Sequence, residues 1–448
     1  MALDGEALKQ RRQERKAREA KQADKRKKIV RLAVGITAAV LAVALVLLLV
    51  LPEKDPSNET AQTPQDQTVI HLVSGGDVNV NDCTAAGDLD YTAAFLDVAH
   101  LLAQGDITAL NFEGNLLGAP YGTDTKSAPQ SMAQALSSAG VDFIQLANSY
   151  SINQGMGGLQ STISRVKEAG MTPLGVYANT AEFKEQKGFT LIDVQGVKVA
   201  LVAFTKGMDG LALPSGNEHC VNVLYKDYQS TYQTVDTEGI TAILDNVNRV
   251  KPDITVALLH WGSEFNDTIS SSQKRIVNLL KENGVDAIIG SHPHYVQKIS
   301  YEEETGFFLA YSLGDFFSDA ARAGSEYSIL LDLEITKDNK TGVAKITNYS
   351  YTPIFSVVEE GKTPRVMRIY EAMAAYEAGH IDRVKGDRQV HIHRRIGGAL
   401  QVHRLIQLGN CAVAAVEVIG KICFIQRFLS QYQLSDAVFI AFSDTIHC

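Results

Sequence analysis

The sequence predicts an α/β fold with a largely parallel or mixed sheet. Short apolar runs alternate with helical patterns over residues 69–314. Leu159, Ile163 and Val166 are spaced four and three residues apart, which is the period of a helix that faces a core. Gly170 follows them, and glycine just past the last apolar position is a common helix stop. Strands that alternate with helices are typical of α/β domains.

Seven apolar runs in this region predict strands. They are Val69–Ser74, Ile107–Asn111, Val141–Ala147, Val197–Phe204, Ile254–Leu259, Val285–Ile289 and Phe307–Tyr311. Two longer runs, Tyr327–Ile335 and Val343–Ser350, come next and flank a polar turn sequence at residues 338–342. This pattern predicts a hairpin after the α/β region.

The amino terminus carries the signals of a membrane anchor. Residues 1–31 hold twelve Lys/Arg and five Asp/Glu, a formal charge of +7 in a chain whose net charge is −9. Residues 32–51 contain no charge, and a helix of that length, at about 1.5 Å per residue, spans a hydrocarbon core of about 30 Å. Positive flanking charge stays cytoplasmic, so we expect a single-pass protein of the cell membrane with residues 1–31 inside and the main domain outside. A cleavable signal peptide is the alternative, but the basic region is long for one.

The rest of the chain divides by composition. Residues 52–68 are polar with three prolines and predict an extended linker. Residues 69–384 form the expected extracytoplasmic domain. Residues 385–448 contain no proline, and we interpret them either as a small helical appendage or as the product of a shifted reading frame. Beside a membrane span, anionic lipid is a simpler partner for the basic segment than nucleic acid.

Neither the cysteines nor the glycine-rich segment predicts a functional site. The cysteines form no CxxC pair, which argues against a thiolate zinc site or a thioredoxin-like motif, and their spacing reveals no disulfide. The glycine-rich segment Gly155–Gly158 lacks the lysine and Ser/Thr of a P-loop, and we interpret it as a loop before a helix.

Two histidine segments carry the strongest functional signal. His260 follows one apolar run, and His292 and His294 follow the next. In an open α/β sheet, ligands bind outside the carboxyl ends of the strands. Three imidazoles at such ends indicate a metal site that faces water, although three unrelated loop histidines are the alternative. We interpret Trp261, beside His260, as a packing residue.

Carboxylates and amides follow the other predicted strands. Asp77 and Glu113 are the acidic candidates, and Asn111 and Asn148 are the amides. Such oxygen and nitrogen ligands suit Mn, Fe, Zn or Mg, and a two-metal centre could orient a phosphoester and generate hydroxide at neutral pH. Turn or cap roles are the alternative for Asp77 and Asn148. Asp315 also follows a strand; we interpret it as a turn residue, with a ligand role as the alternative.

At these strand ends the chain resembles the bacterial CapA-type capsule-synthesis proteins, which are associated with poly-γ-glutamate capsule assembly. That family is similar in fold to the calcineurin-like metallophosphoesterases. The resemblance covers residues 69–384 and rests on six blocks in order: Gly76-Asp77, Asn111-Phe112-Glu113, Leu146-Ala147-Asn148, His260-Trp261-Gly262, Gly290-Ser291-His292-Pro293-His294 and Tyr311-Ser312-Leu313-Gly314-Asp315-Phe316. It implies a layered α/β/β/α sandwich and a site for one or two divalent metal ions.

The resemblance also implies roles for single residues. The implied metal or phosphate-site groups are Asp77, Glu113, Asn148, His260, His292 and His294, with Glu113 as a bridging carboxylate. The family usually shows Asn-Asn-His where this chain has Asn148-Ser149-Tyr150, so Tyr150 takes the place of the expected proton donor. Its reference pKa near 10 makes it a poor acid at neutral pH, and losing a general acid typically costs about 10²–10⁴ in rate. Smaller departures are Ser291 for a usual His and Asp315 for a usual Asn.

Two functions fit these features. One is a membrane-anchored metal-dependent hydrolase or transferase that acts on an envelope polymer, with His260 and Tyr150 as catalytic candidates and His260 or His294 stabilising developing charge. The other is a non-catalytic protein that binds or exports the polymer, so the sequence leaves open whether the chain is an enzyme. The expected partners are an anionic polymer such as poly-γ-glutamate, the membrane and polymer-synthase subunits, but no nucleic acid.

Overall fold

The computed structural model describes residues 66–381, apart from residues 87, 321 and 360–361. Predicted segments that lie wholly or largely outside the described residues are 1–31, 32–51, 52–68 and 385–448. In the described part of the chain, no helix combines the length and apolar character needed to cross a bilayer.

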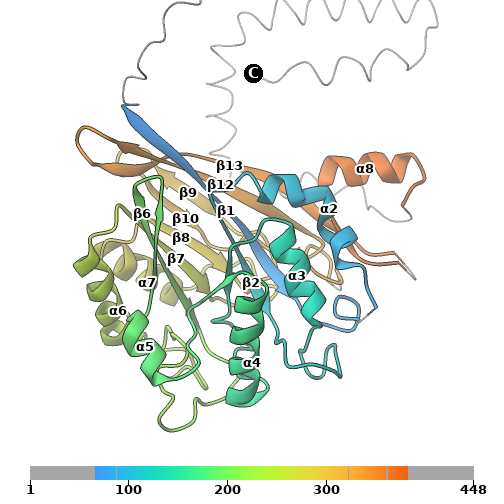
Figure 1. Ribbon diagram of the computed structural model, residues 1–448, viewed down its shortest axis with the longest axis horizontal. Helices are drawn as coiled ribbons and strands as arrows, with labels where there is room; N and C mark the ends of the chain where they lie inside the picture. Colours follow the sequence, from blue (N-terminus) through green and yellow to red (C-terminus); the bar gives the residue numbers. More distant parts are fainter. Residues whose placement is uncertain (1–65, 87, 321, 360–361, 382–448) are drawn as a thin grey trace, which may run out of the picture. The chain divides into compact units, whose positions relative to one another are not determined.

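The described strands form two mixed sheets (Figure 1). The first has the order β14-β13-β12-β1-β2-β3-β4, with β11 paired to β1. Its strands are β1 (Gln67–Asn79), β2 (Ile107–Glu113), β3 (Phe143–Gln145), β4 (Thr172–Leu174), β11 (Asp315–Phe317), β12 (Tyr327–Asp338), β13 (Ala344–Val357) and β14 (Arg365–Arg368). The second has the order β5-β6-β7-β8-β10-β9 and contains β5 (Thr190–Val194), β6 (Val197–Thr205), β7 (Ile254–His260), β8 (Ala287–Ser291), β9 (Ile299–Glu302) and β10 (Phe307–Ala310).

Parallel and antiparallel pairs occur in both sheets. Strands β1 to β4 are parallel to one another, as are β6, β7, β8 and β10, whereas β12, β13, β5 and β9 pair antiparallel. The predicted α/β fold with a mixed sheet is therefore confirmed. The predicted hairpin is also present, since β12 and β13 pair from Tyr327↔Phe355 to Lys337↔Ala344.

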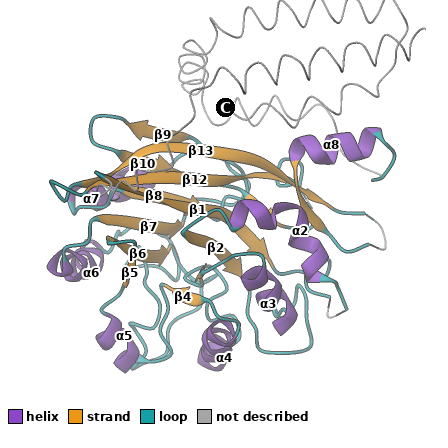
Figure 2. Cartoon of the chain, turned by 45° about the horizontal axis from the view of Figure 1, so that its top comes forward, coloured by secondary structure: helices purple, strands orange, loops and turns teal. Residues whose placement is uncertain are grey.

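Helices cover the outer face of each sheet (Figures 1 and 2). Helices α2 (Tyr91–Leu102), α3 (Gln130–Ser138) and α4 (Gly155–Glu168) share a core with β1 and β2. Helices α6 (Thr237–Val250) and α7 (Ser271–Glu282) share a second core with β6, β7 and β8. A third core fills the space between the sheets, so the layers follow the α/β/β/α order. The remaining helices are α5 (Thr180–Gln186) and α8 (Ile369–Glu377).

The inner strands are apolar on both faces because they lie between two cores. Along β6, Leu201 faces the other sheet, while the next residue, Val202, faces α6 and α7. A strand buried on both faces is expected to be a continuous apolar run, because successive side chains alternate in direction. This explains why β6 and β7 match their predicted runs closely.

The first strand is longer than predicted. We expected it to end before Gly75, but β1 continues through Asp77 to Asn79. A Cβ on Gly76 would lie 1.7 Å from the carbonyl oxygen of Gly314, so only glycine lets β11 approach here. The amide of Asp77 then donates to that same carbonyl at 3.0 Å, and Asp77 pairs in register with Asp315.

The glycine-rich segment also differs from its prediction. Residues 155–158 form the first turn of α4, so the interpretation as a loop was wrong. The apolar period of α4 offsets the low helix propensity of these glycines, since Leu159, Ile163 and Val166 are all buried. The end of the helix is as predicted, because Gly170 follows it with a φ of +89°.

Candidate metal centre

Polar side chains from both sheets converge where β1, β2, β3, β7 and β8 end and where β11 begins. The first sheet supplies carboxylates and amides: Asp77, Asn111, Glu113, Asn148 and Asp315. The second sheet supplies imidazoles: His260, His292 and His294. Each of these residues is at most 7% exposed. The structure therefore brings the candidates predicted at the strand ends into one buried cluster.

Asp77 joins the two sheets. Its Oδ1 accepts a hydrogen bond from Asn111 Nδ2 at 2.7 Å, and its Oδ2 accepts one from the backbone amide of His292 at 2.9 Å. The Nδ1 atom of His294 lies 3.7 Å from the same Oδ2. Burial, reinforced by the neighbouring carboxylate of Glu113, raises the pKa of Asp77 to about 7.

Glu113 and His260 form a buried pair. The Oε1 atom of Glu113 is hydrogen-bonded to Nε2 of His260. Burial raises the pKa of Glu113 to about 7 and lowers the pKa of His260 to about 3. Both shifts favour the neutral forms, because each charged form loses its hydration in the interior. His260 is therefore a neutral imidazole at pH 7.

His294 carries the opposite shift because it lies among carboxylates. Its Nδ1 is 2.7 Å from Oδ1 of Asp315. Burial alone would lower the pKa of His294, but Asp315, with help from Glu113 and Asp77, raises it well above the usual value. The interpretation of Asp315 as a turn residue was wrong: it begins β11 and faces the cluster.

The other face of His294 is covered by an aromatic ring. Phe265 stacks on His294 with ring centroids 4.9 Å apart. The guanidinium of Arg322 lies over the Phe265 ring, 4.2 Å from its centroid. The stack on Phe265 contributes to the burial of His294.

Lys206 belongs to the site, although it is not among the residues predicted from the sequence. Its Nζ donates to Nε2 of His292 at 3.1 Å and to the carbonyl oxygen of Gly262 at 3.0 Å. Burial lowers the pKa of Lys206. A signal was present in the sequence, because Lys206 follows the predicted strand 197–204 just as His260 follows its own strand.

The two asparagines bind the cluster to the backbone. Asn148 donates through Nδ2 to Oδ1 of Asn111 at 3.2 Å and to the carbonyl of Phe112 at 2.6 Å. The Oδ1 atom of Asn148 accepts the backbone N–H of Tyr150 at 3.0 Å. The Asn148 side chain thus orients Asn111, which in turn orients Asp77.

Tyr150 lies at the edge of the cluster. Burial, reinforced by the carboxylate of Glu113, raises the pKa of Tyr150. The ammonium of Lys126 is 4.6 Å from the centroid of the Tyr150 ring. A phenol whose pKa is raised holds its proton more tightly, so this position suits a packing role better than proton donation.

The donors fit a divalent metal ion. Among the described residues, Asp77, His294 and Asp315 form one group whose ligand atoms lie within 4.8 Å of one another, and Glu113, His292 and His294 form a second. Carboxylate and imidazole are the donors that Mn, Fe and Zn accept. The cluster therefore indicates metal binding.

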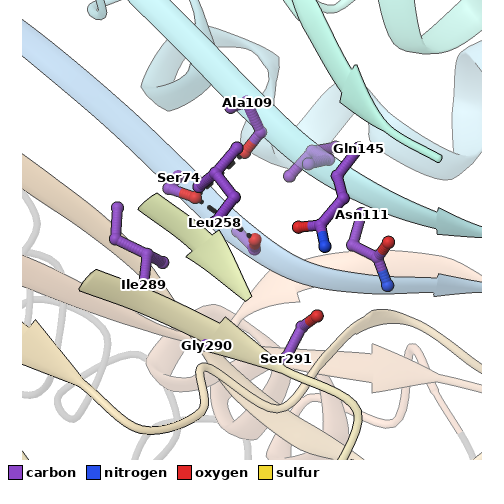
Figure 3. Close-up of a pocket in the computed structure, with 10 residues that line it drawn as sticks. Ser74, Ala109, Asn111, Gln145, Leu258, Ile289, Gly290 and Ser291 are labelled. Atoms are coloured by element: carbon purple, nitrogen blue, oxygen red, sulfur yellow. Dashed lines mark hydrogen bonds between the residues drawn. The ribbon is translucent and has the colours of Figure 1, made fainter. Parts of the chain in front are cut away.

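A small cavity lies behind the cluster, between the sheets (Figure 3). Asn111 from the first sheet and Ser291 from the second both line it, and its volume is about 10 Å³. That is room for about one water molecule, so no larger ligand enters here. The hydroxyl of Ser291 is buried and makes no hydrogen bond with any described residue. Trp261 is a packing residue, as predicted: it is fully buried in the core that the second sheet shares with α6 and α7, and it stacks on Tyr311.

The fold and the cluster define an α/β domain with a buried carboxylate–imidazole centre. Residues 63–320, more than half of the chain, match the family described as Bacterial capsule synthesis protein PGA_cap. The chain belongs to this family, which confirms the resemblance drawn from the six sequence blocks.

Curated relatives and a solved structure are also similar to this chain. The capsule biosynthesis protein CapA of Bacillus anthracis is 26% identical over 250 residues, which cover 53% of this chain and 56% of that protein. The PGA biosynthesis protein CapA of Bacillus subtilis (strain 168) is 24% identical over 201 residues, or 45% of this chain and 48% of that protein. The chain thus spans about half the length of these relatives. The calcineurin-like phosphoesterase YfkN from Bacillus subtilis is 17% identical, with a TM-score of 0.39, over 64% of this chain and 90% of that chain.

Proposed function

We propose that this chain is a membrane-anchored, extracytoplasmic protein of capsule-polymer synthesis that works through a metal centre. Family membership supports the link to capsule synthesis. The basic residues 1–31 and the uncharged residues 32–51 support a single-pass anchor with the amino terminus in the cytoplasm. The substrate we propose is an anionic envelope polymer such as poly-γ-glutamate, handled together with polymer-synthase subunits at the membrane.

The reaction we propose is metal-dependent hydrolysis or transfer at a phosphoryl or acyl centre of that polymer. The observation that carries it is the convergence of three carboxylates with three imidazoles in one buried site: Asp77, Glu113, Asp315, His260, His292 and His294. A divalent ion bound there would act as a Lewis acid and lower the pKa of a water molecule.

The surrounding residues would have distinct tasks. Asp77, His294 and Asp315 would hold the ion. Asn111 fixes the direction of the Asp77 carboxylate through its 2.7 Å hydrogen bond. His260, whose pKa is lowered by burial, is neutral and serves as the hydrogen-bond partner of Glu113.

The runner-up is a non-catalytic protein that binds or exports the polymer on the same fold. The observation that favours it is Tyr150, which stands where the family usually has histidine and whose pKa is raised. Without a competent proton donor, a leaving group would have to depart unprotonated. Under this alternative the metal centre binds carboxylates of the polymer and does not cleave it.

The test uses the full-length chain purified in detergent. We expect bound divalent metal in the wild type, loss of that metal in Asp77→Ala and His292→Ala, and metal-dependent hydrolysis of a model phosphodiester. Metal-free wild-type protein, together with unchanged polymer production by both variants in cells, would refute the metal-dependent proposal. Retained metal with no hydrolysis, but with binding of poly-γ-glutamate, would select the runner-up.

A further inference from the structure

We propose that Lys206 is a built-in cation that makes this a one-metal centre, with the ion held by Asp77, His294 and Asp315. The inference rests on the metal centre proposed above. It specifies how many ions the centre binds and which residue determines that number.

Lys206 is held firmly at its position. Its backbone amide donates to the carbonyl of His260 at 2.8 Å, which continues the register between β6 and β7 past the ends of the strands. The ammonium contacts the Gly262 carbonyl and His292, and it lies 4.7 Å from the centroid of the Tyr232 ring. Hydrogen bonds and a cation–π contact thus fix the charge beside the cluster.

The hydrogen bond from Lys206 uses the one lone pair that His292 could offer. An ammonium only donates, so Nε2 of His292 must be the acceptor in this bond. A neutral imidazole then carries its proton on Nδ1, and neither nitrogen has a free lone pair. A metal ion bound by Glu113, His292 and His294 would therefore have to break the bond from Lys206.

The group of Asp77, His294 and Asp315 does not involve Lys206. An ion bound there would replace the proton that Nδ1 of His294 shares with Asp315. The ring nitrogen of His294 faces Asp315 and Asp77, which are themselves members of the group. The ammonium of Lys206 contacts the Gly262 carbonyl, His292 and the Tyr232 ring, and none of these is a member of the group. This group can bind an ion while Lys206 keeps its partners.

Charge balance points to the same count. The buried carboxylates of the cluster are Asp77, Glu113 and Asp315. In the metal-bound state, with the three carboxylates ionised and His294 a neutral ligand, one divalent ion and one ammonium balance the three negative charges. A second divalent ion would add two uncompensated positive charges and would lie close to the Lys206 ammonium, and uncompensated charge is costly in a buried site.

The experiment counts metal ions in the full-length chain in detergent. The protein is stripped with a chelator, dialysed against Mn²⁺, and its manganese is counted by mass spectrometry. Electron paramagnetic resonance then distinguishes an isolated Mn²⁺ from a coupled pair. We expect one isolated ion in the wild type and two coupled ions in Lys206→Met, which frees the lone pair of His292. Lys206→Arg keeps the cation and should hold one ion.

The matched control is Lys337→Met. Lys337 is also a partly buried lysine with two acceptors, the carboxylate of Asp253 and the carbonyl of Gly196, but it is on β12, away from the cluster. This variant should keep one ion. Two coupled ions in the wild type, or a single ion in folded Lys206→Met, would overturn the inference and leave the metal centre intact. If Lys206→Met does not fold, the wild-type and Lys206→Arg counts decide. No ion in any variant would overturn the metal centre itself.

Discussion

The backbone amide of His292 donates to the carboxylate of Asp77 at 2.9 Å, although the two residues are 215 positions apart in the chain. The bond joins β1 of the first sheet to the segment after β8 of the second. It fixes the approach of the two sheets at the point where the candidate ligands meet. The candidate metal centre is therefore a product of the interface between sheets and not of one loop.

Asp77→Asn tests this relationship without removing bulk. We expect Mn²⁺ affinity to fall by about 100-fold, because a charged ligand becomes a neutral one, while the circular dichroism spectrum is retained. Asp286→Asn is the control: Asp286 is an aspartate whose pKa is likewise raised, but it is only partly buried and accepts the amide of Thr255 at the opposite end of the strands. Equal Mn²⁺ affinities in the two variants would show that Asp77 is not a ligand of the ion.

Metal affinity should rise with pH. The pKa values of Asp77 and Glu113 are raised to about 7 from ordinary values near 4, so below pH 7 both acids hold protons that the ion must displace. Each displaced proton changes the apparent Kd about tenfold per pH unit. We expect the Kd for Mn²⁺ to fall at least about tenfold from pH 5.5 to 6.5 in calorimetric titrations. A Kd that is constant over this interval would contradict the raised pKa values.

Gly76→Ala should damage both the fold and the site. An added Cβ would lie 1.7 Å from the carbonyl of Gly314 and would push β11, which carries Asp315, away from β1. We expect a loss of more than about 3 kcal/mol in the free energy of unfolding, together with loss of Mn²⁺ binding. Gly157→Ala is the contrasting substitution, since nothing lies within 4 Å of its Cβ in α4, and it should stabilise the chain by about 0.5–1 kcal/mol. A small change in the free energy of unfolding of Gly76→Ala would show that β11 can move away from β1 without destabilising the fold.

Trp261 should contribute stability and not chemistry. Its ring is fully buried, stacks on Tyr311 at 5.6 Å between centroids, and donates from Nε1 to the Tyr311 carbonyl at 2.9 Å. Trp261→Ala should cost about 3–5 kcal/mol in urea unfolding followed by circular dichroism. Trp261→Phe keeps most of the contact area and should cost clearly less while metal content stays unchanged. Metal loss in a folded Trp261→Phe protein would assign the ring a role in the site.

Much of the site could be predicted because parallel strands place their carboxyl ends at one edge. Applied to the sequence alone, that rule selects Asp77, Glu113 and the three histidines. It failed for Asp315 because a carboxylate after Gly314 has the local sequence of a turn, and only the pairing of β11 with β1 shows that it faces His294. The same rule points to Lys206 at the end of strand 197–204, but lysine at a strand end is also common on surfaces.

The layers of the fold followed from the sequence where burial is uniform. Continuous apolar runs such as β6 and β7 match their predicted strands because both faces contact a core. The extension of β1 past Gly76 could not be predicted, because it depends on the approach of Gly314 from a distant part of the chain. The first turn of α4 was missed because its glycines have low helix propensity and the tertiary packing of the following turns overrides it.

The most direct test of the metal centre is the position of the ion. Crystals of the full-length chain loaded with Mn²⁺ would be measured at the manganese absorption edge, and the anomalous difference map would locate the metal. We predict one peak, bounded by the carboxylates of Asp77 and Asp315 and the imidazole of His294. A map without a peak among these residues, in crystals that contain manganese elsewhere, would contradict the account.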